Sequence, residues 1–298
     1  MTVEHIPVLA NTLAERIKLP PDGVMVDATV GHGGHSLLLG SVLGPEAVIV
    51  GMDIDRNAVR RAHAILKPLA CKVILIHSNF SQIRKQLFSR AIEKVDLILA
   101  DLGLCSAQLA NAGFGLSFQA NMPLDMRIDK RLERTAADII NETDEKSLAD
   151  MIYTLGQDRA SRRIARFIVQ EREAEPITTT GRLAEIVCRA LRRNRRSRRS
   201  RIHPATRTFQ ALRIAVNDEL ENLKKLLTSA PGLLRKNGYV AILSYHSLED
   251  GLVKRDFIQN AKAGTYRVIT KKPLVPTRDE IKENRRARSA KLRIAQRQ

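Results

Sequence analysis

An acidic residue followed by closely spaced glycines stands near the start of the chain. Asp27 closes the apolar run 24–26, and the glycines that follow are Gly31, Gly33 and Gly34. This order predicts a strand, a glycine turn and the start of a helix. Glycines let the backbone bend sharply and let a ligand approach closely, because they carry no Cβ. The stretch therefore predicts a small-molecule site at the carboxyl end of a first strand.

Two classes of cofactor bind at such a turn. A dinucleotide fingerprint reads Gly-x-Gly-x-x-Gly/Ala, but Ser36 stands here where the third small residue is expected. A turn for S-adenosylmethionine reads Asp/Glu-x-x-x-Gly-x-Gly, and Asp27, Gly31 and Gly33 meet that spacing. The spacing favours the methyl donor. A glycine turn that only packs a helix on a sheet remains an alternative.

A second acid follows at the distance expected for a ribose contact. The apolar run 47–52 ends at Asp53, about twenty residues after the glycines. A carboxylate there accepts hydrogen bonds from the ribose hydroxyls of an adenosine cofactor. The alternative role is a helix cap, but Asp55 is better placed to cap a helix over 56–66.

Two more strand ends carry candidate site residues. The run 72–77 leads to Phe80, whose ring could stack on adenine or simply be buried in the core. The run 95–100 ends at Asp101. Because these strands alternate with helical stretches, we expect a doubly wound, Rossmann-like α/β sheet with its site at the carboxyl ends of the strands.

The second half of the chain supplies the remaining elements of the sheet. A long helix is expected from His203, with one apolar stripe facing the sheet. The stripe comprises Phe209, Leu212, Val216, Leu220, Leu223 and Leu227. A fifth strand over 239–245 leads to His246, and 266–270 and 291–295 are candidate closing strands.

The segment between the fourth strand and this long helix is helical throughout. Thr143 and Thr180 each precede a helical run and are read as helix starts. We therefore expect an inserted all-helical substrate-recognition domain over 113–203, within a catalytic domain formed by 1–112 and 204–298.

The chain carries a large positive charge. Lys and Arg outnumber Asp and Glu by 50 to 32, which gives a net charge of +18, and residues 192–201 hold seven arginines. Such a balance is typical of proteins that bind nucleic acid, with an anionic membrane surface as the second possibility. A solvated loop is the alternative for the arginine run. The RNA-binding candidates within it are Arg192, Arg193, Arg195, Arg196, Arg198 and Arg199.

Composition also argues against several classes of protein. Three cysteines without a Cys-x-x-Cys pair favour neither a disulfide framework nor a zinc site, so we expect a reducing compartment. No apolar run approaches the length of a membrane span, and the first residues resemble neither a signal nor a transit peptide. We expect a cytoplasmic protein that binds neither membrane nor metal; the oligomeric state cannot be read from the sequence.

Five stretches together resemble the RsmH (MraW) family of ribosomal RNA methyltransferases, and the resemblance runs from about His5 to Ala295. The longest motif, at 203–214, is far more specific than a generic methyltransferase turn. The stretches are Asp27-Ala28-Thr29-Val30-Gly31-His32-Gly33-Gly34-His35-Ser36, Pro123-Leu124-Asp125-Met126-Arg127, His203-Pro204-Ala205-Thr206-Arg207-Thr208-Phe209-Gln210-Ala211-Leu212-Arg213-Ile214, His246-Ser247-Leu248-Glu249-Asp250 and Ala287-Arg288-Ser289-Ala290-Lys291-Leu292-Arg293.

The resemblance implies a class I S-adenosylmethionine-dependent methyltransferase with an inserted helical domain. It implies N4-methylation of a cytidine in the decoding region of 16S rRNA within the small ribosomal subunit. The cofactor contacts it implies are Gly33, Gly34, His35, Asp53, Phe80, Asp101 and Gln108. Arg127 and Arg207 lie in two of the matching stretches and join the RNA-binding candidates.

The sequence departs from the family's usual pattern near the expected substrate entrance. Where the family reads Asp-Leu-Gly-Val-Ser-Ser-Pro-Gln-Leu, this chain has Asp101-Leu102-Gly103-Leu104-Cys105-Ser106-Ala107-Gln108-Leu109. Phe114 stands in place of an Arg, Leu116 in place of a Phe and Gly251 in place of an Arg. The exact target nucleotide is therefore left open.

The expected chemistry needs positioning more than activation. The amine of cytosine is a weak nucleophile because its lone pair is conjugated with the ring, so Asp101 is expected to orient it, with Tyr245 or His246 lining the other side. Three alternatives stay open. They are a DNA amino-methyltransferase, although the usual Asp/Asn-Pro-Pro-Tyr/Phe motif is missing; a nicotinamide oxidoreductase; and a ribosome-assembly factor without activity.

Overall fold

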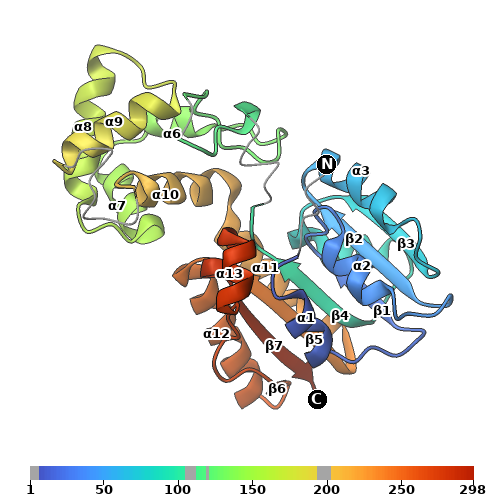
Figure 1. Ribbon diagram of the computed structural model, residues 1–298. Coiled ribbons are helices and arrows are strands. Elements are labelled where there is room, and N and C mark those ends of the chain that lie inside the picture. Colours follow the sequence, from blue (N-terminus) through green and yellow to red (C-terminus); the bar gives the residue numbers. More distant parts are fainter. Residues whose placement is uncertain (1–6, 105–111, 119–120, 193–202) are drawn as a thin grey trace. The chain divides into compact units, whose positions relative to one another are not determined.

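The computed structural model describes residues 7–104, 112–118, 121–192 and 203–298 (Figure 1). The chain forms two compact units. The first, here called the sheet unit, comprises Met1–Gly103 and Leu220–Gln298, and the second, the helical unit, comprises Leu104–Glu219. None of the described helices is long and apolar enough to span a membrane.

The sheet unit contains a seven-stranded sheet in the order β3-β2-β1-β4-β5-β7-β6. Its strands are β1 (Val24–Asp27), β2 (Val48–Asp53), β3 (Lys72–His77), β4 (Val95–Asp101), β5 (Leu234–Ser244), β6 (Tyr266–Val268) and β7 (Lys291–Arg297). The first five are parallel neighbours, which confirms the predicted Rossmann-like α/β sheet. β7 runs antiparallel to both β5 and β6, so the sheet is mixed.

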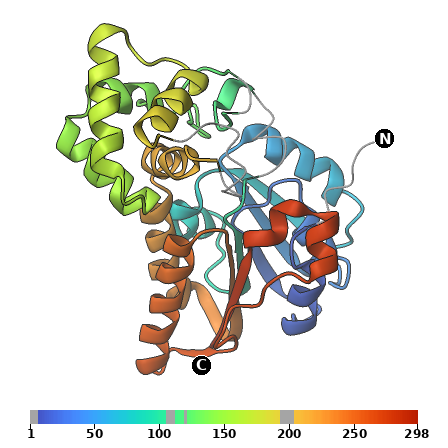
Figure 2. The same cartoon turned by 60° about the vertical axis from the view of Figure 1, so that its left-hand side comes forward.

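Helices cover both faces of this sheet, as Figures 1 and 2 show. Leu13 and Leu39 pack on one face, and Ile83, Leu223 and Val253 pack on the other. The helices of the unit are α1 (Ala10–Arg16), α2 (Gly34–Gly40), α3 (Arg56–Leu66), η1 (Phe80–Gln82), α4 (Ile83–Phe88), α11 (Glu219–Leu233), α12 (Ser247–Lys262), α13 (Arg278–Glu283) and η3 (Arg285–Ser289). Both faces are buried, which explains why the central strands are almost wholly apolar.

Side-chain caps set several helix starts. Asp55 accepts a hydrogen bond from the Asn57 amide at the start of α3, as the sequence predicted. In the helical unit, the caps expected at Thr143 and Thr180 are each displaced by one residue. Asp144 caps α7 and Thr179 caps α9. Thr143 instead ends the preceding helix, because its extended backbone places it outside α6.

The helical unit has its own hydrophobic core. Its described helices are η2 (Ala112–Phe114), α6 (Ala136–Glu142), α7 (Glu145–Gly156), α8 (Ser161–Ala174), α9 (Thr180–Ala190) and α10 (Thr206–Asn217). Apolar side chains at helical spacing, such as Ile152, Ile168 and Val187, meet in this core. The described part of the unit has no regular strand, only an isolated bridge between Pro123 and Thr179.

The long helix predicted from His203 is wrong. Asp218 adopts a left-handed backbone with φ of 49° and separates α10 from α11. Phe209 therefore lies in the core of the helical unit, whereas Leu223 packs against the sheet. Aspartate tolerates this left-handed conformation better than most residues. The apolar spacing continues across the break, so the spacing alone does not reveal that the helix ends there. The compact helical unit extends to Glu219, beyond the boundary expected at residue 203.

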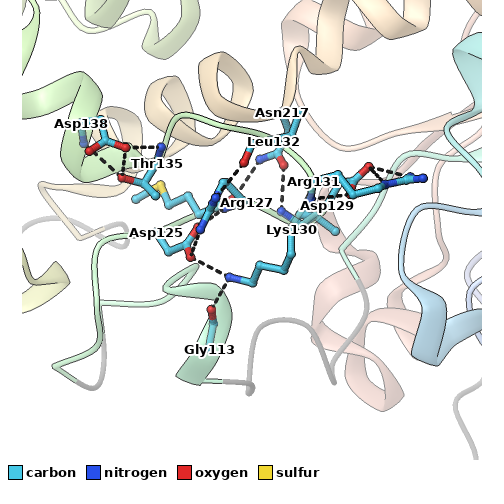
Figure 3. A network of polar contacts seen from close by, with 12 residues as sticks. Gly113, Asp125, Arg127, Asp129, Lys130, Arg131, Leu132, Thr135, Asp138 and Asn217 are labelled. Atoms are coloured by element: carbon cyan, nitrogen blue, oxygen red, sulfur yellow. Dashed lines mark hydrogen bonds and ion pairs between the residues drawn. The ribbon is translucent and has the colours of Figure 1, made fainter.

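A charged network around Asp125 organises the loop before α6 (Figure 3). The guanidinium of Arg127 donates two hydrogen bonds to the Asp125 carboxylate, at 2.8 and 3.1 Å. Lys130 Nζ donates to the same carboxylate at 2.7 Å. Burial raises the pKa of Asp125, but the hydrogen bonds from Arg127 and Lys130 outweigh it and lower the pKa to about 2. The carboxylate therefore stabilises the folded helical unit as an ion.

The Asp125→Asn variant should lose stability in a pH-dependent way. A folded-state pKa of about 2, below the ordinary 3.8, contributes about 2 kcal/mol of unfolding free energy above pH 4. This contribution disappears as the pH falls through about 2. We expect urea unfolding, followed by circular dichroism, to show this difference in unfolding free energy between the parent and the variant at pH 7. The difference should disappear in acid.

A matched control is Glu142→Gln, which removes an exposed ion pair with Arg134. Exposed pairs contribute between about 0 and 1 kcal/mol, so this variant should unfold almost like the parent. An Asp125→Asn variant as stable as the parent at pH 7 would contradict the role given to the network.

Candidate active site

The acids predicted from the sequence meet at one edge of the sheet. Asp27, Asp53 and Asp101 are the last residues of β1, β2 and β4, which are adjacent in the sheet. These strands are parallel, so their carboxyl ends lie together. This edge is where α/β sheets bind their ligands.

Asp27 holds the turn that follows β1. Its carboxylate accepts hydrogen bonds from the hydroxyl of Ser36, at 2.7 Å, and from the amide of Thr29, at 3.2 Å. The residue is only 2% exposed, and this burial raises the pKa of its carboxyl group. Ser36 thus has a role that the comparison with dinucleotide motifs did not reveal, since it ties the first turn of α2 to the end of β1.

The glycine turn adopts backbone conformations that favour glycine. Gly31 and Gly33 have φ values of 52° and 86°, in the left-handed region. A Cβ at Gly33 would lie 3.2 Å from the side chain of Leu66, and one at Gly34 would lie 3.2 Å from the ring of Pro7. The turn is therefore closely packed as well as strained for other residues.

The two histidines of the turn, His32 and His35, have different partners. Nε2 of His35 lies 2.9 Å from the carbonyl oxygen of Val8. His35 is buried, so its ring connects the turn to the segment before α1. His32 lies 2.9 Å from the guanidinium of Arg61. The contact of His35 with a cofactor stays a prediction.

Asp53 is linked to the glycine turn by its carboxylate. Oδ2 accepts from the amide of Gly31 at 2.9 Å, and Oδ1 accepts from the amide of Asp55 at 2.8 Å. Burial raises the pKa of Asp53 to about 6, although these two amides lower it. Each carboxylate oxygen has a second lone pair, so the group can still accept hydrogen bonds from two hydroxyls.

Asp101 and Tyr245 are close neighbours at the ends of β4 and β5. Burial raises the pKa of the Tyr245 hydroxyl well above its usual range, and the nearby negative charge of Asp101 raises it further. The Asp101 amide donates to Oγ1 of Thr29 at 2.6 Å, and Oδ1 accepts from the amide of Gly103 at 3.0 Å. The pair is thereby tied to the turn after β1.

Gly103 makes room for the tyrosine ring. A Cβ at this position would lie 2.6 Å from Cε2 of Tyr245, which is closer than carbon atoms can approach. Any other residue would displace the ring and move its hydroxyl relative to Asp101. The sequence suggested no role for Gly103, because the contact joins residues 142 positions apart.

His246 caps a helix in this structure. The Glu249 amide donates to Nδ1 of His246, and the Glu249 carboxylate accepts from the amides of Tyr245 and His246. These contacts form a capping box at the start of α12. His246 therefore supports the backbone that carries Tyr245, and a direct role of its ring in catalysis stays a prediction.

For the remaining predicted site residues the structure gives less information. Phe80 begins η1 after β3, is half-buried and packs against the core of the sheet unit, so its stacking on adenine stays a prediction. Gln108 lies outside the described residues. Five of the predicted RNA-binding arginines also lie outside them, namely Arg193, Arg195, Arg196, Arg198 and Arg199.

The three described arginines of the predicted RNA interface belong to the helical unit. Arg127 is occupied by Asp125 and by the carbonyl oxygen of Leu132 (Figure 3). Arg207 is exposed and donates to the carbonyl oxygen of Gln157 at 3.2 Å, and Arg192 is exposed. Of the three, Arg192 and Arg207 are the better candidates for phosphate contacts.

Comparison with known proteins gives matches along almost the whole chain. Residues 2–298 match the model of the MraW methylase family. This chain is also similar to proteins named ribosomal RNA small subunit methyltransferase H. The one from Koribacter versatilis (strain Ellin345) is 43% identical, covering 98% of this chain and 94% of the relative. The one from Deinococcus radiodurans is 45% identical, covering 99% and 90%.

Solved structures also match at low sequence identity. An rRNA methylase from Streptococcus thermophilus is 10% identical, with a TM-score of 0.44, covering 97% of this chain and 93% of that one.

Binding of S-adenosylmethionine should weaken as the pH falls through about 6. The ribose hydroxyls would donate to the ionised Asp53 carboxylate, whose pKa is raised to about 6, so protonation removes the acceptor. We expect calorimetry to show an affinity that is constant above about pH 7 and decreases below pH 6, by up to about tenfold per unit. The Asp53→Asn variant should bind weakly, with little pH dependence in this range.

Asp55→Asn provides the control. Its amide side chain can still cap α3, and the pH dependence should remain. Its midpoint should move slightly downward, because the charge of Asp55 contributes to the raised pKa of Asp53. An unchanged pH profile in Asp53→Asn would exclude this carboxylate as the titrating group.

Proposed function

The chain belongs to the MraW methylase family, and on that premise we propose that it methylates the ribosomal RNA of the small subunit, using S-adenosylmethionine. The family match covers residues 2–298. The curated relatives, which share 39–46% of their residues with this chain, are named as small-subunit rRNA methyltransferases. Membership in a methylase family argues against the nicotinamide oxidoreductase.

The residues at the carboxyl edge of the sheet fit S-adenosylmethionine. Gly31 and Gly33 keep side chains out of the turn, and the Asp53 carboxylate offers acceptors for the ribose hydroxyls. Phe80 would contact the adenine. When bound, the cofactor supplies a methyl group on a positively charged sulfur. The task left to the protein is to place the accepting nitrogen in line with it.

We propose that the acceptor is the N4 amine of a cytidine in the decoding region of 16S rRNA. An ionised Asp101 can accept a hydrogen bond from this amine and fix its orientation. Asp101 is well suited to this role, because the Gly103 amide donates to its carboxylate and its own backbone amide donates to Thr29. Tyr245 lies close by, and the charge of Asp101 contributes to its raised pKa. The observation that carries the proposal is this fixed carboxylate beside the glycine turn.

Tyr245 would act as a positioning residue. Because its pKa is raised, the hydroxyl stays protonated and would donate to Asp101. This donation keeps the carboxylate in one rotamer and leaves its other lone pairs for the amine. His246 would contribute through the capping box that fixes the backbone of Tyr245.

Replacing Asp101 by Asn should abolish methyl transfer while the protein stays folded. The Asn side chain has one acceptor oxygen and an NH2 donor where the carboxylate has two acceptor oxygens, and it carries no charge. We therefore expect kcat to fall by about 100-fold or more. Tyr245→Phe should lower kcat by about tenfold, because it removes one hydrogen bond to a charged group. Single-turnover assays with radiolabelled S-adenosylmethionine, together with circular dichroism, would measure both effects.

Gly103→Ala serves as the steric counterpart of Tyr245→Phe. It removes no polar group but forces the ring and its hydroxyl away from Asp101, so it should lower kcat to a similar extent. Near-normal turnover in Asp101→Asn would refute the assignment of this carboxylate.

The substrate is proposed to be an assembled small subunit rather than free RNA. One site must be selected among many cytidines, and single-stranded or looped RNA is recognised by its shape and by splayed bases. The net charge of +18 supports binding to a polyanion, and the helical unit carries several of the exposed arginines. Since such subunits assemble in the cytoplasm, we propose that the protein acts there.

Subunits from cells that lack this protein should be methylated much faster than the same RNA without ribosomal proteins. The physical reason is that free RNA does not hold the target region in the shape that the enzyme binds. Filter-binding assays give the rates, and mass spectrometry of nuclease digests would identify N4-methylcytidine and map its position. Single-stranded DNA of the same sequence is the control for the DNA methyltransferase alternative.

Equal rates on free RNA and on subunits would contradict recognition of the assembled particle. Binding without methyl transfer to either would favour the ribosome-assembly factor.

A further inference from the structure

A groove lies on the face of the sheet unit opposite to α1 and α2. It is formed by α4 and α11, and holds a volume of about 660 Å³. Both helices pack their apolar residues, such as Leu87 and Leu226, into the core beneath. The groove lies entirely within the sheet unit and contains none of the acids of the candidate active site.

The lining of the groove is strongly basic. Arg84 and Lys85 come from α4, and Lys224 and Lys225 come from α11. All four are exposed. The acid in the lining is Glu221, which already forms an ion pair with Lys224 at 3.1 Å. The lining therefore carries a formal charge of +3, which suits a chain of phosphates.

An aromatic side chain completes the lining. Phe88, at the end of α4, is 82% exposed. An exposed phenylalanine gains nothing for the core, but its ring offers a surface on which a base can stack. Cations that follow a phosphate backbone together with an aromatic ring for a base are the features of sites for single-stranded nucleic acid.

Topology places one end of the groove at the catalytic edge of the sheet. α4 and η1 follow β3, so Ser81 of the lining lies next to Phe80 at the carboxyl end of that strand. α11 leads into β5, whose first residue pairs with the first residue of β4. Both helices therefore run from the catalytic edge toward the opposite edge. A strand bound along the groove would reach the active site at its Ser81 end.

We propose that this groove binds a single-stranded segment of the substrate RNA next to the target nucleotide. The phosphates lie along Arg84, Lys85, Lys224 and Lys225, and one base stacks on Phe88. The inference rests on the proposed function for the identity of the RNA. The groove thus gives the sheet unit its own RNA contact, independent of the arginines of the helical unit.

The test uses the full-length protein and two variants of the groove. Lys224→Gln/Lys225→Gln removes two of its charges, and Phe88→Ala removes the ring. The matched control is Lys254→Gln/Arg255→Gln, which removes two adjacent exposed cations of α12 that do not line the groove. All the changed side chains are exposed, so the variants should fold like the parent.

Binding would be measured by fluorescence anisotropy with a short labelled oligouridylate, and with a duplex RNA of equal length. We expect the Lys224/Lys225 variant to reduce the slope of log affinity against log salt by about 1.4, or 0.7 for each lost phosphate contact. Phe88→Ala should weaken single-strand binding by about fivefold or more, with little effect on the duplex. The control pair should leave single-strand binding close to that of the parent.

Equal losses in the groove variants and in the control pair would overturn the proposal, as would a Phe88→Ala variant that binds the oligouridylate like the parent. Methylation of small subunits is measured separately. If subunits are not methylated but the groove variants lose binding, the proposed function fails and the groove stands. If subunits are methylated equally by all variants, the groove is not part of substrate recognition.

Discussion

Three carboxylates end three parallel strands at the same edge of the sheet, and the rest of the site depends on holding them there. Asp27 and Asp53 both have raised pKa values, chiefly because they are removed from water and in part because of neighbouring acids. The protein offsets this cost with donors from the turns and the helix start that follow the strands. Ser36 and Thr29 donate to Asp27, the amide of Gly31 donates to Asp53, and the amide of Gly103 donates to Asp101. The donors link the three strand ends into one network.

The glycines of the site are explained by the same need to hold the carboxylates at the edge of the sheet. The Gly31 amide reaches Asp53 from a backbone with positive φ, which glycine adopts at little cost. Gly103 leaves room for the Tyr245 ring, because a Cβ at this position would lie 2.6 Å from Cε2 of the ring. Residues without side chains thus decide where the charged groups can be held. A larger residue at Gly103 would displace the Tyr245 ring and its hydroxyl without removing any polar group.

The sequence predicted the features of this site that depend on neighbouring residues. The strand ends at Asp27, Asp53 and Asp101 and the cap at Asp55 follow from local patterns, and the structure confirms them. The close approach of Tyr245 to Asp101 and Gly103 joins distant parts of the chain, so no local pattern contains it. The break at Asp218 was missed for a different reason. The apolar period runs through it, and one backbone angle sends the two halves of the stripe into different cores.

The positive charge, too, is described only in part by local sequence, because contacts with distant residues decide which cations are available. A count of arginines treats each as available to RNA, but the structure uses several of them to hold the protein together. Arg172 donates to the carbonyl oxygens at the end of α6, and Arg293 is buried against Asp250. Arg127 lies in a motif that suggested RNA binding, yet its guanidinium has its donors turned to Asp125 and Leu132. A guanidinium held in this way cannot reach a phosphate without breaking contacts that stabilise the fold. We therefore expect RNA to be recognised by cations with few internal partners, and these are found on the surfaces of both units.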